Sequence, residues 1–514
     1  MLRLNNESGT RRSNKWKEVA PQVLASTIAA LMHTITGQSV AYSGVIIPQM
    51  IEEQNRNGSR GSISITEFDS AWIASAPVFS GLAASVLAGT MADAFGRIRT
   101  VMLASVFGII SHALIATASS VPVIISGRIL VGFCWMFILN PTAVYISEIS
   151  RPDVRGLLLS LMQVFKAIGI LSVYLEGWFL NWRTIAWLTI GYILIPTISM
   201  FFIPESPAWL VSKLRFEKAK RSLAWFHKYS KKSVEEELLL VQSDQSNREK
   251  LTWKELFQLF LLPTFYKPFL ILTVIFCFQQ FSGAYVIIFN FVIFFKEIGT
   301  DIDPYLVAVA ISGLKVVISF GMIVLMKKFR RRVLMMVGSG GMTCSMAVSG
   351  LYTRWLQQGD KTTEVTITLR IFLGTSNQQW IVLICMLSYV VFLSISLMFV
   401  PLILSSEIFP VKIRGTAYSM LITMSNVFTF VALQCYFPLH DALGGSSELQ
   451  FFFAAVSLSA MVFSYLFLPE THNYKLIDIE NYFRNHTIYK RPNTRKRNEN
   501  ADVTSLESDP TLSD

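Results

Sequence analysis

The sequence predicts an all-α integral membrane protein in which twelve transmembrane helices form two six-helix bundles. Three observations support this fold class. Hydrophobic residues make up 52% of the 514 residues and charged residues only 15%, a balance typical of chains that reside in lipid. Twelve apolar stretches approach the length of about 20 residues that a helix needs to cross the hydrocarbon layer. In addition, a short element of the first half returns in the second half.

The repeated element is the most direct sign of two related halves. The acid Glu148 and the base Arg155 return, within the same local sequence, as Glu407 and Arg414. In each copy the acid ends an apolar run, and an Arg-Gly pair opens the next run. Such helix ends can carry charge because they reach water at the membrane surface. This return predicts a duplicated bundle.

The twelve expected helices fall six and six around a polar stretch. We place them at residues 22–48, 69–91, 99–119, 122–146, 157–180, 184–203, 268–295, 304–326, 333–353, 379–406, 415–438 and 449–468. The chain therefore divides into an N-terminus (1–21), a first bundle (22–203), a central loop (204–267), a second bundle (268–468) and a tail (469–514). Basic and apolar residues are interspersed in the central loop, which favours short amphipathic helices there. The polar tail is expected to be largely disordered.

Positive charge is distributed unevenly along this topology. Most of the 45 Lys and Arg residues fall before the first helix, in the central loop, in the tail or in loops on the same side as these. Cytoplasmic loops of membrane proteins are enriched in Lys and Arg. We therefore predict cytoplasmic N- and C-termini in a multi-pass protein of the plasma membrane. The net charge of +11 then needs no nucleic-acid partner.

The sequence gives no indication of an enzyme, a metal or a cofactor. The five cysteines lie in expected helices without the spacing of metal ligands. No nucleophile–base group or phosphate-binding loop is apparent. Asn57, Gly58 and Ser59 form a glycosylation sequon in an expected outer loop, and Asn57 is therefore the predicted glycosylation site.

Several short motifs cluster at the inner ends of the expected helices. Residues 89–97 read Gly-x-x-x-Asp-x-x-Gly-Arg, residues 204–207 read Pro-Glu-Ser-Pro, residues 469–471 read Pro-Glu-Thr and residues 279–283 read Gln-Gln-x-Ser-Gly. With the repeated element, this set resembles the sugar porter family of the major facilitator superfamily, and most of all the insect facilitated trehalose transporters and facilitative glucose transporters. The resemblance covers about residues 20–480. It implies the major facilitator fold, whose two bundles rock around a central cavity.

Charged residues at the inner helix ends predict a cytoplasmic gate. Its acids would be Asp93, Glu148, Glu205, Glu407 and Glu470, and its bases Arg97, Arg155, Arg331, Arg332 and Arg414. Ion pairs across the two bundles, worth about 0.2–1 kcal/mol each when exposed, would close the inner side while the outer side is open. The alternative is that these charges only anchor the helix ends. The loop before Arg331 lacks the acid and the glycine that the family usually has, which predicts a looser second half of the gate.

The resemblance also implies a set of substrate-binding residues. Amides both donate and accept hydrogen bonds, as sugar hydroxyls do. Gln163, Gln279 and Gln280 match the sugar-binding glutamines of the family. Membrane glutamines can instead join neighbouring helices. Other pocket positions carry residues that the family does not usually have there. The predicted set is Gln163, Gln279, Gln280, Tyr285, Lys315, Ser425 and Asn426.

Two lysines fall near the middle of expected helices. A buried charged lysine is costly unless it is paired or faces a wet cavity. Two interpretations of the role of Lys166 and Lys315 therefore stay open. One or both contact an anionic substrate, or they form an internal ion pair, for example with Glu176, or stay neutral between helices.

The function predicted from these features is facilitative (uniport) transport of a sugar such as trehalose or a hexose by alternating access. Proton-coupled members of the family carry an Asp in helix 1 near an Arg in helix 4, whereas here Ser43 stands at the first position and Arg128 remains. An organic anion carried on the same scaffold is the first alternative. The second is a non-transporting nutrient sensor that signals through its central loop and tail. The expected partners are the small-molecule substrate and the lipid bilayer.

Overall fold

The computed structural model describes residues 19–57, 63–226, 234–246, 259–298, 302–358, 380–409, 414–470 and 483. Within these ranges the regular secondary structure is helical. Twelve of the described helices are long and apolar enough to cross a membrane, which agrees with the predicted number. These spans are Val19–Arg56, Glu67–Phe95, Arg97–Ala116, Val121–Ile149, Asp153–Phe179, Trp182–Met200, Pro263–Glu297, Pro304–Met322, Arg331–Trp355, Trp380–Ser405, Thr416–Gln434 and Ser446–Phe467.

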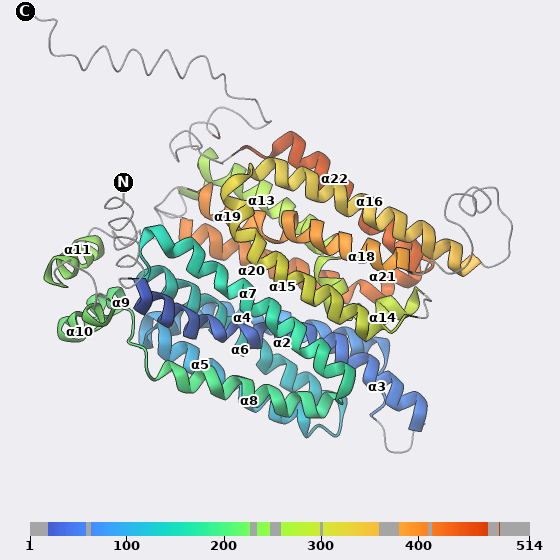
Figure 1. Ribbon diagram of the computed structural model, residues 1–514, viewed down its shortest axis with the longest axis horizontal. Helices are drawn as coiled ribbons and strands as arrows, with labels where there is room; N and C mark the ends of the chain where they lie inside the picture. The colour runs from blue at the N-terminus through green and yellow to red at the C-terminus, as the bar shows by residue number, and fades with distance from the viewer. Residues whose placement is uncertain are drawn as a thin grey trace, which may run out of the picture.

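The first six spans occupy the lower part of Figure 1, coloured blue to green. Their helices pack mainly as α5 against α6, α4 against α6, α2 against α7 and α5 against α8. Residues 19–31 are helical and lead into α2. The helices are α2 (His33–Ala41), α3 (Ser43–Asn57), α4 (Glu67–Phe95), α5 (Arg97–Ala116), α6 (Val121–Ile149), α7 (Pro152–Phe179) and α8 (Trp182–Met200).

The last six spans occupy the upper part of Figure 1, coloured yellow to red. In this half α16 packs extensively against α22 and α18. The helices are α13 (Pro263–Phe281), α14 (Ala284–Glu297), α15 (Pro304–Lys328), α16 (Arg331–Gln358), α18 (Trp380–Leu393), the π-helix η1 (Ser394–Met398), α19 (Val400–Glu407), α20 (Arg414–Gln434), α21 (Tyr436–Leu443) and α22 (Ser446–Phe467).

The two halves meet along two equivalent interfaces. The most extensive contacts between them join α7 to α15 and α4 to α20. Helix α7 contains the fifth span of its half and α15 the second, whereas α4 contains the second span and α20 the fifth. Exchanging the halves therefore converts one interface into the other. This is the arrangement expected of a parallel duplication.

Three short helices follow the first half and lie at one end of the molecule. They are α9 (Pro207–Ser212), α10 (Phe216–Phe226) and α11 (Val234–Ser246), at the left of Figure 1. We call this end the α9 end, and the opposite end, where α3 and α14 finish, the α3 end. In the described part of the chain, short helices thus follow the first six spans.

Local sequence explains where several helices begin. Thr66 and Asp69 form a capping box at the start of α4, because the backbone N–H of Asp69 donates to Thr66 Oγ1 over 3.2 Å and the backbone N–H of Thr66 donates to Asp69 Oδ2 over 3.0 Å. The carboxamide of Asn181 accepts from the backbone N–H of Thr184 over 2.9 Å at the start of α8. Each cap satisfies a backbone donor that has no partner inside the helix.

Two of the spans expected as single helices are interrupted at a glycine or just before a proline. The span predicted at 268–295 breaks between α13 and α14, where Gly283 has a φ of +91°. Only glycine adopts this left-handed conformation without a steric penalty. The span predicted at 379–406 contains η1 just before Pro401, because proline cannot donate the backbone hydrogen bond that would continue the α-helix.

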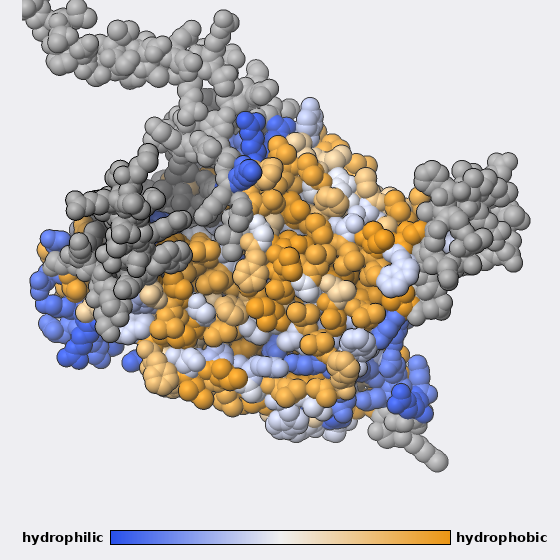
Figure 2. Space-filling view, in the orientation of Figure 1, coloured by the Kyte–Doolittle hydropathy of each residue, from blue (hydrophilic) through white to orange (hydrophobic). Residues whose placement is uncertain are grey.

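The surface agrees with residence in a bilayer. Figure 2 shows hydrophobic residues covering the middle of the face in view, with hydrophilic residues toward both ends. Large apolar side chains are highly exposed, among them Ile195 of α8, Val317 of α15, and Phe201 and Phe202 directly after α8. A soluble protein rarely exposes so much contiguous apolar surface, so lipid is the natural covering.

Candidate functional site

A buried carboxylate organises the α9 end of the first bundle. Glu205 Oε1 accepts from the backbone N–H of Arg97 over 3.0 Å, and Glu205 Oε2 accepts from the backbone N–H of Ile98 over 3.2 Å. The first N–H groups of α5 have no partner inside the helix, and the helix dipole favours an anion there. Burial raises the pKa of Glu205, while the N–H groups of Ser206, Ile98 and Arg97 act in the opposite direction.

The side chain of Arg97 contacts two further carboxylates at this end, those of Asp93 and Glu148. Its Nη1 lies 2.7 Å from Asp93 Oδ1, while Nη2 and Nε lie 3.0 Å and 3.2 Å from the two oxygens of Glu148. Ser206 Oγ donates to Glu148 over 2.5 Å. The fork geometry of a guanidinium matches a carboxylate in two parallel bonds. The ends of α4, α5 and α6 and the start of α9 are therefore held together.

The second bundle repeats this capping geometry. The backbone N–H of Arg331, the first residue of α16, donates to Glu470 Oε1 over 3.1 Å. Glu470 and Arg331 thus stand to α16 as Glu205 and Arg97 stand to α5. Arg332 instead lies against the Tyr465 ring, 5.3 Å from its centroid.

Of the remaining members of the predicted gate, the structure describes the side chain of Arg155. Arg155 donates to the backbone carbonyl of Ser150 over 3.3 Å. The side chains of Glu407 and Arg414 lie outside the part of the chain that the structure describes, as does that of Asn57. The ionic contacts described at this end join residues of the same bundle. The pairs across the bundles, which the sequence predicted for a state whose outer side is open, stay a prediction. In this conformation the described contacts brace helix ends within each bundle.

Contacts across the bundles occur at the α3 end. Glu52 of α3 forms an ion pair with Lys296 of α14. The Tyr174 hydroxyl of α7 donates to the backbone carbonyl of Ile288 in α14 over 2.6 Å. Gln434 of α20 donates to Ser75 Oγ of α4 over 2.9 Å. These three contacts close the α3 end.

Sequence reasoning missed the α3-end contacts, although a signal was present. Glu52 and Lys296 are charged residues of opposite sign near the C-terminal ends of the first and seventh spans, and these two spans occupy the same position in their halves. The backbones of α3 and α14 also approach each other closely near this ion pair. A Cβ on Gly44 would lie 3.3 Å from the carbonyl oxygens of Ile288 and Phe289, so α3 and α14 touch closely there.

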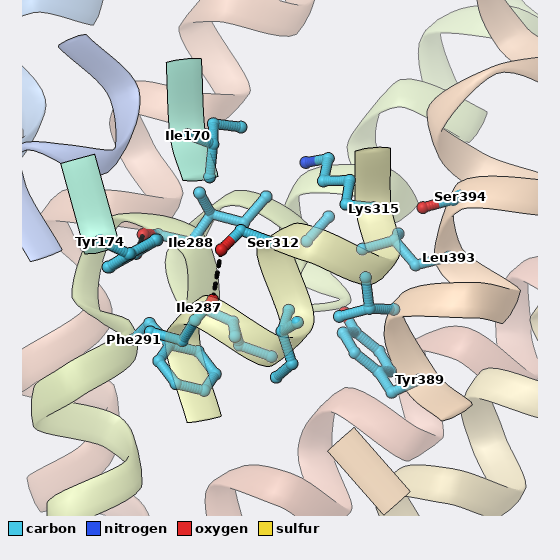
Figure 3. Close-up of a pocket in the computed structure, with 14 residues that line it drawn as sticks. Ile170, Tyr174, Ile287, Ile288, Phe291, Ser312, Lys315, Tyr389, Leu393 and Ser394 are labelled. Carbon is cyan, nitrogen blue, oxygen red and sulfur yellow. Dashed lines mark hydrogen bonds between the residues drawn. The ribbon is translucent and has the colours of Figure 1, made fainter. Parts of the chain in front are cut away.

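A cavity lies between the bundles, enclosed by α7, α14, α15, α18 and η1 (Figure 3). Most of its lining is apolar, and its polar members are Tyr174, Ser312, Lys315, Tyr389 and Ser394. Of the predicted substrate-binding residues, Lys315 lines this cavity. The others lie outside its lining.

The predicted amide and hydroxyl residues form a second group nearby. Gln280 Nε2 donates to Ser425 Oγ over 3.1 Å, which joins α13 to α20. Gln279 Nε2 lies 3.6 Å from the sulfur of Met398 in η1. Within the described residues, Gln280 Oε1 and the side-chain nitrogen of Asn426 are buried and have no hydrogen-bond partner. Such atoms are costly to leave unpaired, which suits a site that a polar ligand completes.

Lys166 lies close to two further predicted positions. Its Nζ is 5.6 Å from the ring centroid of Tyr285 and 5.6 Å from that of Trp135, and Ile170, four residues further along α7, lines the cavity together with Lys315. The structure therefore brings Lys166, Tyr285 and Lys315 into one neighbourhood, while Gln163 is half-buried on α7.

The suggested ion pair with Glu176 is wrong. The Glu176 carboxylate accepts from the Tyr192 hydroxyl over 2.9 Å, and its second oxygen is buried without a partner among the described residues. The physical reason is distance along the helix. Lys166 and Glu176 are ten residues apart on α7, which corresponds to about 15 Å of helix.

Arg128 is fully buried in the first bundle and bonds to uncharged groups. Its Nε donates to the Ile73 carbonyl over 2.8 Å, and its Nη1 donates to the Ser39 carbonyl over 3.1 Å. Its Nη2 donates to the hydroxyl of Ser43. Ser43 thus stands beside Arg128, as the resemblance implied, and the position holds a hydroxyl in place of a carboxylate.

Comparison with known proteins places these features in context. The model of the "Sugar (and other) transporter" family matches residues 25–483. The facilitated trehalose transporter Tret1 of Drosophila erecta is 30% identical over 459 residues, covering 89% of this chain and 51% of that protein. Trehalose transporter 1 of Drosophila melanogaster is 29% identical over 459 residues, covering 89% and 51%. The chain thus spans about half the length of the curated relatives that it matches.

Solved structures share the fold at lower identity. The inward open conformation of the xylose transporter XylE from E. coli superposes with a TM-score of 0.69 at 20% identity, covering 89% of this chain and 98% of that one. The proton:xylose symporter XylE bound to 6-bromo-6-deoxy-D-glucose gives a TM-score of 0.63 at 20% identity, covering 91% and 99%.

Proposed function

Since the chain belongs to the sugar (and other) transporter family, we propose that it carries a sugar such as trehalose or a hexose across the membrane by facilitated, alternating-access transport. The resemblance to sugar porters and the predicted fold class are confirmed by the family match and by the solved structures. Relatives named as facilitated trehalose transporters support the substrate class. The chain covers 51% of the length of these relatives, so its own activity needs a direct test.

The observation that carries the proposal is a group of buried polar atoms on α13 and α20 of the second bundle. Gln280 Oε1 and Asn426 Nδ2 are buried without a partner in the described part of the chain, and Gln280 is already oriented by Ser425 over 3.1 Å. One is an acceptor and the other a donor, which is the combination that a sugar hydroxyl can satisfy. Leaving both unpaired in a membrane protein is unfavourable, so a ligand has a clear energetic reason to bind.

The arrangement of contacts supports alternating access. Contacts across the bundles close the α3 end, while the ionic contacts described at the α9 end lie within single bundles. We propose that the α9 end faces the cytoplasm, because Lys and Arg are concentrated in the segments at that end. The structure then corresponds to a state closed toward the outside. A plasma-membrane location is part of the same proposal.

Transport without proton coupling is supported by the surroundings of Arg128. Its described hydrogen bonds go to two backbone carbonyls and to the Ser43 hydroxyl. A serine does not titrate in the physiological range, so this position offers no proton to exchange. The expected result is a sugar flux that does not require a pH gradient.

Uptake into proteoliposomes tests the proposal. The full chain would be reconstituted and supplied with radiolabelled trehalose, glucose and xylose at two pH values, with empty vesicles as the background. We expect saturable flux of at least one neutral sugar, and we expect Gln280→Ala to reduce it about ten- to hundredfold, as for loss of a hydrogen-bonding group that faces a polar ligand. Binding without flux would instead support the nutrient sensor. If the protein showed no binding and no flux for any of these sugars, the proposal would be refuted.

An organic anion is a second candidate, favoured by Lys315 in the cavity lining. The same vesicles would be tested with a panel of carboxylates that lack sugar hydroxyls. Flux of these anions without flux of any sugar would favour this candidate over the first.

A further inference from the structure

Two lysines lie between the bundles without an acidic partner. Lys166 belongs to α7 and Lys315 to α15, and these helices form one of the two main interfaces between the halves. Neither ammonium group has a carboxylate partner among the residues that the structure describes. Ile170, four residues after Lys166 on α7, lines the same cavity as Lys315, so two like charges lie in one region of this interface. Two unpaired, mutually repelling cations at this depth would be unfavourable in the empty protein.

The surroundings of Lys166 offer attraction but no counter-charge. Its Nζ lies 5.6 Å from the ring centroids of Trp135 and Tyr285, a distance at which an aromatic ring attracts a cation. His33 is buried on α2, which packs against α7. The Trp135 Nε1 and His33 Nε2 atoms are buried and lack partners in the described part of the chain. The indole N–H can only donate.

The surroundings of Lys315 are similar. Figure 3 shows its side chain at the cavity near Ile170, with Ser394 close to it. The Ser394 hydroxyl is buried and has no partner among the described residues. The hydroxyls of Tyr174 and Tyr389 are already used, because they donate to the backbone carbonyls of Ile288 and Ser282. The unused polar groups of this cavity therefore include an ammonium and a hydroxyl.

Together these groups make a region that is rich in donors and lacks acids. Two ammonium groups, an indole N–H and a serine hydroxyl can each donate to an oxygen anion. A neutral sugar would leave both positive charges uncompensated, whereas an anion would relieve their mutual repulsion. The amide pair Gln280 of α13 and Asn426 of α20 lies in the second bundle, as Lys315 does, and suits hydroxyl groups. One molecule with both kinds of group would satisfy both regions.

We infer that Lys166 and Lys315 form a subsite for one anionic group, and that the transported sugar carries a carboxylate or a phosphate. The inference rests on the proposed sugar transport and specifies its substrate class as acidic sugars. The lysines supply the charge-assisted bonds, while the aromatic rings of Trp135 and Tyr285 hold Lys166 in place. Because the two lysines come from opposite bundles, an anion between them also draws α7 and α15 together.

Matched sugars test the inference. The full chain in proteoliposomes would be supplied with radiolabelled glucose, glucuronate and glucose 6-phosphate at equal concentrations. We expect at least one acidic sugar to be taken up with a kcat/KM about ten- to hundredfold above that of glucose, the size of one charge-assisted hydrogen bond. The two acidic sugars distinguish a carboxylate from a phosphate as the preferred group.

Variants locate the effect at the lysines. Lys315→Gln and Lys166→Gln should each lower the ratio of acidic to neutral uptake about tenfold or more, and Lys315→Arg should restore part of it. Lys328→Gln is the matched control, because Lys328 ends the same helix α15 and is exposed, and it should leave the ratio unchanged. If a lysine variant does not fold, the comparison of sugars in the wild-type protein still decides the question.

Two outcomes would overturn parts of the reasoning, and they differ. Preferential uptake of glucose, with the same ratio in wild type and in the lysine variants, would overturn the anion subsite and leave sugar transport standing. Absence of uptake for neutral and acidic sugars alike would overturn the proposed function itself.

Discussion

The ion pair between Glu52 and Lys296 should contribute measurably but modestly to closure of the α3 end. The two side chains are 47% and 40% exposed, so the pair is worth about 0.2–1 kcal/mol. Its removal by Glu52→Gln should lower the ratio of closed to open states by a factor of about 1.4 to 5. The bond from Tyr174 to Ile288 is 2.6 Å long and its donor is buried, so Tyr174→Phe should remove about 0.5–1.5 kcal/mol and have an equal or larger effect.

Labelling of a cavity residue from the α3 side measures this closure. Ser312 lines the cavity, and Ser312→Cys would be made in a background without the five native cysteines. A membrane-impermeant maleimide added on the α3 side should then react about 1.4 to 5 times faster in Glu52→Gln than in its parent. Exchanging the charges, with Glu52→Lys and Lys296→Glu together, should return the rate toward that of the parent.

A second ion pair provides the matched control. Lys220 Nζ and Glu235 Oε1 lie 2.6 Å apart in the helices that follow the first bundle, away from the interface between the halves. Glu235→Gln should therefore leave the labelling rate unchanged. If Glu52→Gln and Tyr174→Phe both left the rate unchanged, or if Glu235→Gln raised it equally, the α3-end contacts would not be what holds this end closed.

Three further predictions concern stability, measured by thermal unfolding of the purified protein. Glu205→Ala removes the acceptor of several backbone N–H groups and should lower the free energy of unfolding by about 1–3 kcal/mol; an unchanged melting temperature would contradict the capping role. Gly283→Ala should cost about 1–2 kcal/mol for its left-handed backbone and would place a methyl 2.9 Å from the Phe453 ring, whereas Gly313→Ala, which has nothing within 4 Å, should be neutral. Burial raises the pKa of Glu205 above 4.5 in the folded protein. Protonation of Glu205 therefore stabilises the folded state fully below pH 4.5, and this contribution is lost as the pH rises through the raised pKa. A stability difference between wild type and Glu205→Gln that does not change over this window would argue against the raised pKa.

Hydropathy and motif spacing were sufficient for the architecture. Twelve apolar runs gave the number of spanning helices, because each run must satisfy its backbone hydrogen bonds internally in lipid. That Arg97 and Glu148 lie at helix ends on the same membrane surface followed from the motifs, but their contact within one bundle did not. Placing Glu470 and Arg331 at that surface followed from the same reasoning, whereas the cap that Glu470 forms on α16 did not.

Tertiary packing decided the features that the sequence left open. The apolar run 268–295 does not show whether the helix continues through Gly283 or breaks there, because glycine tolerates both backbone conformations. Glu52 and Lys296 lie far apart in sequence, and only the approach of α3 to α14 brings them together. Glu176 is not the partner of Lys166 because the rise of the helix places the two residues about 15 Å apart. Their separation of ten residues on one expected helix was already visible in the sequence.

Transport through a protein whose α3 end is covalently closed tests the central claim most directly. Cysteines would replace Glu52 and Lys296 in the background without native cysteines, and a short bifunctional thiol reagent with a reducible bridge would join them. The account predicts that cross-linking abolishes sugar flux in proteoliposomes and that reduction of the bridge restores it, because the cavity can then open on both sides in turn. Undiminished flux through the fully cross-linked protein would contradict alternating access.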